Sequence, residues 1–147
     1  MHKEKEALTL EIKDAEKLHG HLGPFLVIGV KMARLAKKAL NVDKDKLGDM
    51  QIMAELPLTP PFSCILDGIQ ATTKCTIGNK KLEVRNSNGD IVAIFRLKSQ
   101  NKALKICLNK QVVERLKEQL SKGVPNEELA WKIAATSEDQ LFKVENG

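Results

Sequence analysis

Aromatic side chains are scarce in this sequence of 147 residues, which has no tyrosine, one tryptophan and four phenylalanines. Proteins that bind single-stranded nucleic acid stack the bases on aromatic rings, so this class is disfavoured although the net charge is +5. The lysines and arginines are spread along the chain, and several have the spacing of the solvated face of an amphipathic helix. We therefore expect no nucleic-acid partner.

Long apolar runs are also missing. The longest, residues 25–30, ends at Lys31, whereas a membrane-spanning helix needs about 20 apolar residues. The beginning of the chain is charged and lacks the apolar segment of a secretion signal. We therefore expect a cytoplasmic protein without a membrane partner.

The three cysteines, Cys64, Cys75 and Cys107, are too few and too far apart for the usual cysteine frameworks. An odd count without a secretion signal argues against a set of disulfides. No CxxC pair is present, so a zinc ribbon is excluded. The thiols are then expected to be buried, ligating or reactive, and Cys107, inside an apolar strand run, is expected to be a small core residue.

Hydrophobic periodicity predicts an α+β fold. Apolar residues recur at helical spacing from Pro24 to about Asn41, and proline is favoured in a first helical turn. Gly29 inside this helix indicates close packing against another element. Further helices are expected over residues 63–70, 110–122 and 125–135, and strands over residues 49–56, 82–86, 91–97 and 103–108. This order predicts an antiparallel sheet of three or more strands packed against the long N-terminal helix, with helices at the C-terminal end.

Asn88-Gly89 is the strongest local turn signal, since a type I′ turn needs positive φ at both central residues. It predicts a hairpin between residues 82–86 and 91–97. The side of the long helix that carries Leu26, Val30 and Ala33 is expected to face the sheet. We divide the chain into an N-terminal extension (1–14), an α+β core (15–122) and a C-terminal helical appendage (123–147).

His19-Gly20-His21 is the first candidate site, because two imidazoles separated by glycine can turn toward one ion where the backbone is not helical. The alternative is a pair of surface histidines. Cys64 and Cys75 can reach these histidines only through the fold, and the alternative for each is a small buried apolar residue.

The loop over residues 76–81 is a second candidate site. A glycine-containing loop followed by lysines can hold an anion on its backbone N–H groups, which suits a small anionic substrate or cofactor at Thr76, Gly78, Asn79 and Lys80. The alternative is an ordinary turn before a strand.

Three segments together resemble the FmdE family, which takes its name from formylmethanofuran dehydrogenase. His19-Gly20-His21-Leu22-Gly23-Pro24 resembles the family signature HGHxCPG, and residues 64–70 with 74–79 are similar to its C-x-x-D-[AG]-I-Q … C-T-x-G block. Residues 88–108 are similar to the hairpin and strand that follow. The resemblance covers residues 15–122.

The resemblance implies a metal-binding domain that is accessory or related to the molybdenum- or tungsten-dependent formylmethanofuran dehydrogenase. It implies a site in which His19, His21, Cys64 and Cys75 converge on a divalent metal, for which we expect zinc. It also implies that the chain forms a homodimer. The apolar density of residues 24–30 also favours a homodimer.

A bound ion could polarise a carbonyl group or activate water, with Asp67 or Glu55 as a nearby base. Gly23 stands where the family signature has cysteine, which removes one soft donor. The helix that starts near Cys64 is expected to lower the pKa of that thiol. The alternative function is a non-catalytic module that binds a cofactor or a partner and uses the histidines structurally.

Overall fold

The computed structural model describes residues 2–42 and 48–146. The helices are α1 (His2–His19), α2 (Pro24–Ala39), α3 (Cys64–Thr73), α4 (Lys110–Ser121), α5 (Asn126–Ala135) and α6 (Glu138–Leu141), with a short 3-10 turn at Lys98–Gln100. The strands are β1 (Met50–Leu56), β2 (Leu82–Asn86), β3 (Val92–Leu97), β4 (Lys102–Leu108) and β5 (Phe142–Asn146). Within the described ranges, no helix has both the length and the apolarity that crossing a membrane requires.

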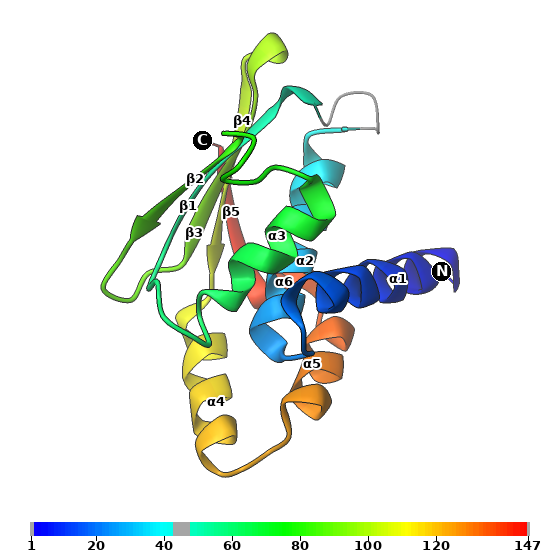
Figure 1. Ribbon diagram of the computed structural model, residues 1–147, viewed down its shortest axis with the longest axis vertical. Helices are drawn as coiled ribbons and strands as arrows, with labels where there is room; N and C mark the ends of the chain where they lie inside the picture. The colour runs from blue at the N-terminus through cyan, green and yellow to red at the C-terminus, as the bar shows by residue number, and fades with distance from the viewer. Residues whose placement is uncertain (1, 43–47, 147) are drawn as a thin grey trace.

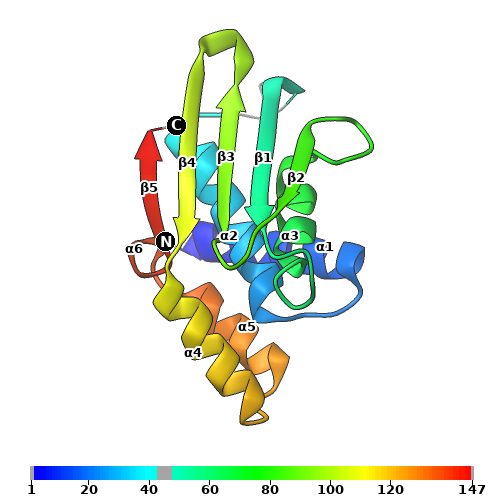
Figure 2. The ribbon, with the colours of Figure 1, turned by 90° about the vertical axis from the view of Figure 1, so that its left-hand side faces the viewer.

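The strands form one mixed sheet in the order β2-β1-β3-β4-β5. β1 and β2 are parallel, and the other neighbours are antiparallel. Helices α1, α2 and α3 lie on one side of the sheet, as Figures 1 and 2 show. Residues of β1 alternate between buried and half-buried, as expected for a strand whose two faces meet different surroundings. The predicted α+β class is confirmed.

The predicted hairpin between residues 82–86 and 91–97 is wrong, because β1 lies between β2 and β3. Neither Asn88 nor Gly89 has the positive φ that a type I′ turn needs. The connection after β2 instead crosses the end of β1, where the Ser87 amide donates to the Leu56 carbonyl at 3.0 Å. The parallel pair β1 and β2 is joined through α3, the kind of crossover that parallel strands require. The tight hairpin of the sheet is β3–β4, with Asn101 at φ 52° in its turn.

Both ends of the chain are part of the same core. α1 includes the residues that were expected to form an N-terminal extension, and its Ile12 and Ala15 are fully buried. β5 adds a fifth strand by pairing with β4, so that Phe142 lies opposite Leu108. Leu129 on α5 is also buried. Residues after 122 therefore complete the sheet and the helical layer.

α2 occupies the centre of the helical layer. Every residue from Pro24 to Ala33 is buried within a single chain. α2 packs against α3, α5 and α1. The apolar density of residues 24–30 is therefore explained without a second copy, and the argument for a homodimer that was based on it is wrong.

Two glycines allow α2 and α3 to cross with their backbones in contact. A Cβ atom on Gly29 would overlap the Ile65 carbonyl oxygen, and one on Gly68 would overlap the Leu26 carbonyl oxygen. The prediction of close packing at Gly29 is confirmed, and the partner is α3. This contact places the start of α3 beside the turn that leads into α2.

We expect Gly68→Ala to lower the free energy of unfolding by about 3 kcal/mol, because the two helices must move apart to admit a methyl group. Urea unfolding measures the change. Gly89→Ala is the matched control, since an added Cβ there meets no atom within 4 Å, and it should change stability by no more than about 0.5 kcal/mol. Equal losses in both variants would contradict a backbone contact at Gly68.

Candidate metal centre

The candidate site is built from the end of α1, the turn before α2 and the first residue of α3. α1 ends at His19, and the Gly20 amide still donates to the Glu16 carbonyl at 2.7 Å. Gly20 has φ 101°, a left-handed conformation that glycine adopts without strain. The turn at Gly20 allows His19 and His21 to approach one another from a non-helical backbone.

His19, His21 and Cys64 form a cluster. One ligand atom of each lies within 4.8 Å of the other two. The two imidazole rings meet edge to face with their centroids 4.4 Å apart. His21 is exposed, His19 is half-buried and Cys64 is buried. The structure thus brings together three of the four side chains that were predicted as ligands.

Asp67 fixes the orientation of His19. It follows Cys64 by one turn of α3, and its Oδ2 lies 2.7 Å from His19 Nδ1. Its Oδ1 accepts a hydrogen bond from Gln70 Nε2 at 3.1 Å. Because a carboxylate only accepts hydrogen bonds, the proton of a neutral His19 is on Nδ1, and Nε2 presents its lone pair.

His19 Nε2 is the atom that makes the cluster fit a metal ion. It is buried and has no hydrogen-bond partner among the described residues. A buried polar atom without a partner is costly and calls for an explanation. Histidines that bind metals almost always donate their other ring N–H to a carboxylate or carbonyl. The Asp67–His19 pair has this arrangement, and the His19 ring lies beside a second imidazole and a thiol.

Burial raises the pKa of the Cys64 thiol, and the nearby Asp67 carboxylate raises it further. The expectation that the start of α3 would lower this pKa is wrong, because loss of solvent and a neighbouring negative charge both disfavour the thiolate. A cation bound between the imidazoles and the thiol would compensate this charge, since metal binding releases the thiol proton.

The other predicted site residues lie apart from the cluster. Cys75 is fully buried, and its thiol donates to the Met50 carbonyl at 3.4 Å. Glu55 lines a hollow that also contains Cys107. That hollow is on the face of β1 opposite the buried Ile52 and Ala54. Of the two candidate bases, Asp67 is the one beside His19.

The loop over residues 76–81 uses its own side chains to hold its backbone. Asn79 Oδ1 accepts hydrogen bonds from the amides of Thr76 and Lys81 at 2.9 and 3.0 Å, and the Asn79 amide donates to Thr76 Oγ1 at 3.0 Å. These N–H groups are therefore committed within the loop. Anion binding at Thr76, Gly78, Asn79 and Lys80 remains a prediction.

Gln70 is the last residue of the first part of the family block, and it is a member of this network that was not predicted as a site residue. Cys64, Asp67 and Gln70 recur at intervals of three on α3, which places each within reach of the next. That spacing and the family block were the available signals. The spacing becomes interpretable only once His19 lies against the same helix.

Comparison with known proteins gives the same family that the signature residues indicated. Residues 18–145 match the family described as "FmdE, Molybdenum formylmethanofuran dehydrogenase operon". The chain is also 30% identical over 110 residues to a protein of Archaeoglobus fulgidus named "Probable S-adenosyl-L-methionine-binding protein". That match covers 74% of this chain and 29% of the relative, so the chain spans less than a third of that protein's length. Because the family match includes both signature segments and nearly all of the sequence, the chain belongs to the FmdE family.

Proposed function

We propose that this FmdE domain binds a divalent metal, zinc, through His19, His21 and Cys64, with Asp67 orienting His19. The observation that carries the proposal is the His19 ring, which lies in the cluster with the other two side chains and whose Nε2 is buried and has no partner among the described residues. Imidazole nitrogen and thiolate sulfur are the donors that zinc prefers. Cys75 is outside the proposal because its thiol faces the Met50 carbonyl.

Three protein ligands leave a coordination position open. Zinc sites of this kind are typically catalytic, whereas structural sites are closed by four protein ligands. A zinc ion bound there would supply Lewis-acid chemistry toward a carbonyl oxygen or a bound water. Asp67, held by His19 and Gln70, would stabilise positive charge on the imidazole.

Gly23 supplies no ligand atom to the cluster, which agrees with an open coordination position on the metal. It precedes α2 with φ −150°, an extended conformation that any residue adopts. A Cβ on Gly23 would lie 3.3 Å from Asn126 Oδ1, so Asn126 packs against the place where the family signature has cysteine. The chain therefore lacks a thiol at this position and fills the neighbouring space from α5.

We expect the purified chain to bind one zinc or cobalt ion, and we expect His21→Ala and Cys64→Ser each to weaken binding by at least about 100-fold. Metal analysis after reloading gives the stoichiometry, and competition with a chromophoric chelator gives the affinity. Cobalt bound to the thiolate adds a charge-transfer band that Cys64→Ser should remove.

Cys107→Ser is the matched control, because this half-buried thiol lies on β4 and outside the cluster. It should bind metal as the wild type does. No metal in the wild type, or equal affinities in all the variants, would reject these residues as ligands.

Asp67→Asn should weaken metal binding by about 10- to 100-fold, the usual effect of losing a carboxylate that orients a ligand histidine. The amide keeps the size of the side chain but removes its charge. Asp139→Asn, at an exposed position of α6, is the charge-matched control. An Asp67→Asn protein with unchanged affinity would show that Asp67 does not position His19.

The second candidate is a non-catalytic module that binds a cofactor. The observation in its favour is the relative's name, which describes S-adenosyl-L-methionine binding. Calorimetry with S-adenosyl-L-methionine tests this on the wild type and on His21→Ala. Binding of equal strength to both, together with no metal binding, would favour this module over the metal centre.

On the basis of the family description, we also propose that the domain acts together with a formylmethanofuran dehydrogenase. On the basis of the family resemblance, we propose that the chain forms a homodimer. Light scattering at micromolar concentration should then give about twice the chain mass of 16.3 kDa. A mass of one chain across the concentration range would reject the homodimer.

A further inference from the structure

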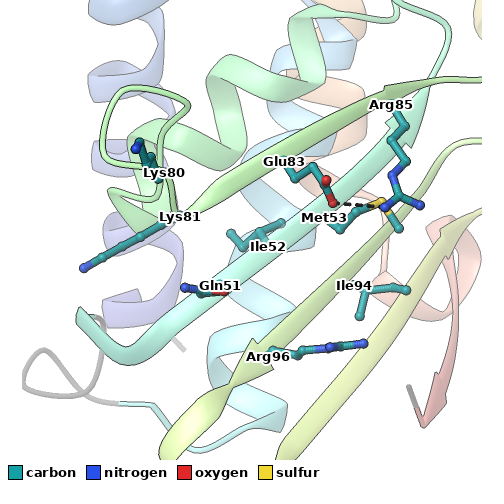
Figure 3. Close-up of a pocket in the computed structure, with 9 residues that line it drawn as sticks. All are labelled: Gln51, Ile52, Met53, Lys80, Lys81, Glu83, Arg85, Ile94 and Arg96. Atoms are coloured by element: carbon teal, nitrogen blue, oxygen red, sulfur yellow. Dashed lines mark hydrogen bonds and ion pairs between the residues drawn. The ribbon is translucent and has the colours of Figure 1, made fainter.

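The sheet face that points away from α1, α2 and α3 contains a hollow of about 400 Å³ (Figure 3). Its floor is formed by side chains of the neighbouring strands β1 and β3. Gln51 lies opposite Arg96 and Met53 lies opposite Ile94 in the pairing of β1 with β3. Met53 is flanked on its other side by Glu83 of β2. The floor is therefore partly apolar, with polar groups at its edges.

Positive charge gathers around this hollow. Lys80 and Lys81 come from the loop before β2, Arg85 from β2 and Arg96 from β3. Glu83 is the acidic residue of the lining, so four positive charges and one negative charge leave a local charge of +3. Four cations around one concave surface raise the local concentration of anions.

Two of the four cationic side chains already have a polar partner within the protein. Arg85 lies 3.3 Å from the Glu83 carboxylate, and Lys81 Nζ donates to the Gly48 carbonyl at 2.8 Å. Among the residues that the structure describes, neither Lys80 nor Arg96 has an acidic side chain within ion-pair distance. Both are exposed and can turn toward a ligand.

We propose that this hollow binds a small phosphate-bearing molecule. Its phosphate groups would interact with Lys80, Lys81 and Arg96, and its organic part would lie on Met53 and Ile94. An arginine guanidinium matches phosphate oxygens in pairs, and lysines add mobile point charges. The volume lies in the range of small-molecule pockets, which span roughly 300–1,000 Å³.

The charge and the lining of the hollow argue against a second copy of the chain and against a single-stranded nucleic acid as its ligand. A second copy would bring the same positive charge against this one, which is unfavourable. Among the described residues, those that line the hollow include no aromatic side chain, so the stacking that single-stranded nucleic acids require is missing. The hollow is on the opposite side of the sheet from His19, His21 and Cys64, so the proposal does not depend on metal binding.

The test is calorimetric titration of the full chain with tripolyphosphate and with ATP at low ionic strength. Lys80→Gln/Arg96→Gln should weaken the binding of both by at least about tenfold, because two charge-assisted contacts are lost. Glu83→Gln should tighten binding several-fold, since it removes the acidic group of the hollow and releases Arg85. ATP should bind more tightly than tripolyphosphate, because only ATP has an organic part to lie on the floor.

Two controls separate this site from general charge and from the metal centre. Lys117→Gln/Lys132→Gln removes the same charge from exposed positions on α4 and α5 and should bind as the wild type does. His21→Ala should also bind unchanged. The proposal is overturned if the wild type binds neither phosphate compound at millimolar concentration, if the control pair loses as much affinity as Lys80→Gln/Arg96→Gln, or if His21→Ala abolishes binding.

Discussion

The contact between Gly29 on α2 and Gly68 on α3 constrains the arrangement of the whole helical layer. Helices normally pack with side chains between them and axes 8–10 Å apart, and here the backbone of each helix fills the space where the other would carry a Cβ. Cys64 and Asp67 lie on the turn of α3 that precedes Gly68. The close crossing therefore brings that turn against His19 and the start of α2. Any residue larger than glycine would separate the helices and, with them, the three side chains of the cluster.

A buried lysine of α2 connects this helix to the end of α5 by hydrogen bonds. Lys31 is 6% exposed and donates from Nζ to the carbonyl oxygens of Ile133, Ala134 and Thr136. These carbonyls lie in the last turn of α5 and directly after it, where a helix leaves carbonyls without partners in its own hydrogen-bond ladder. Burial lowers the pKa of Lys31, while the three acceptors compensate its charge. α5 in turn packs Asn126 against Gly23, so this polar contact also helps to define the side of the turn where the family has a thiol.

The two faces of the sheet have different surroundings. One face is covered by apolar helices and supports the cluster of His19, His21 and Cys64. The other is half-exposed, and its alternate residues bring cations of β2 and β3 together with those of the preceding loop. The strand alternation produces both surfaces from the same strands, because successive side chains point to opposite sides.

Local signals in the sequence were sufficient for α2 to α5, β1 to β4 and the fold class, since the spacing of apolar residues depends only on the local period, but they did not predict α1, α6 or β5. They also identified Gly29 as a packing position and, through the family resemblance, His19, His21 and Cys64 as residues that belong together. The tertiary structure alone decided that β1 lies between β2 and β3, that residues 142–146 complete the sheet, and that Cys75 faces the Met50 carbonyl. It also decided that the Cys64 thiol has a raised pKa and that Lys80 and Arg96 line one hollow. These outcomes depend on contacts between segments far apart in the chain, where burial and neighbouring charges outweigh what any local pattern indicates.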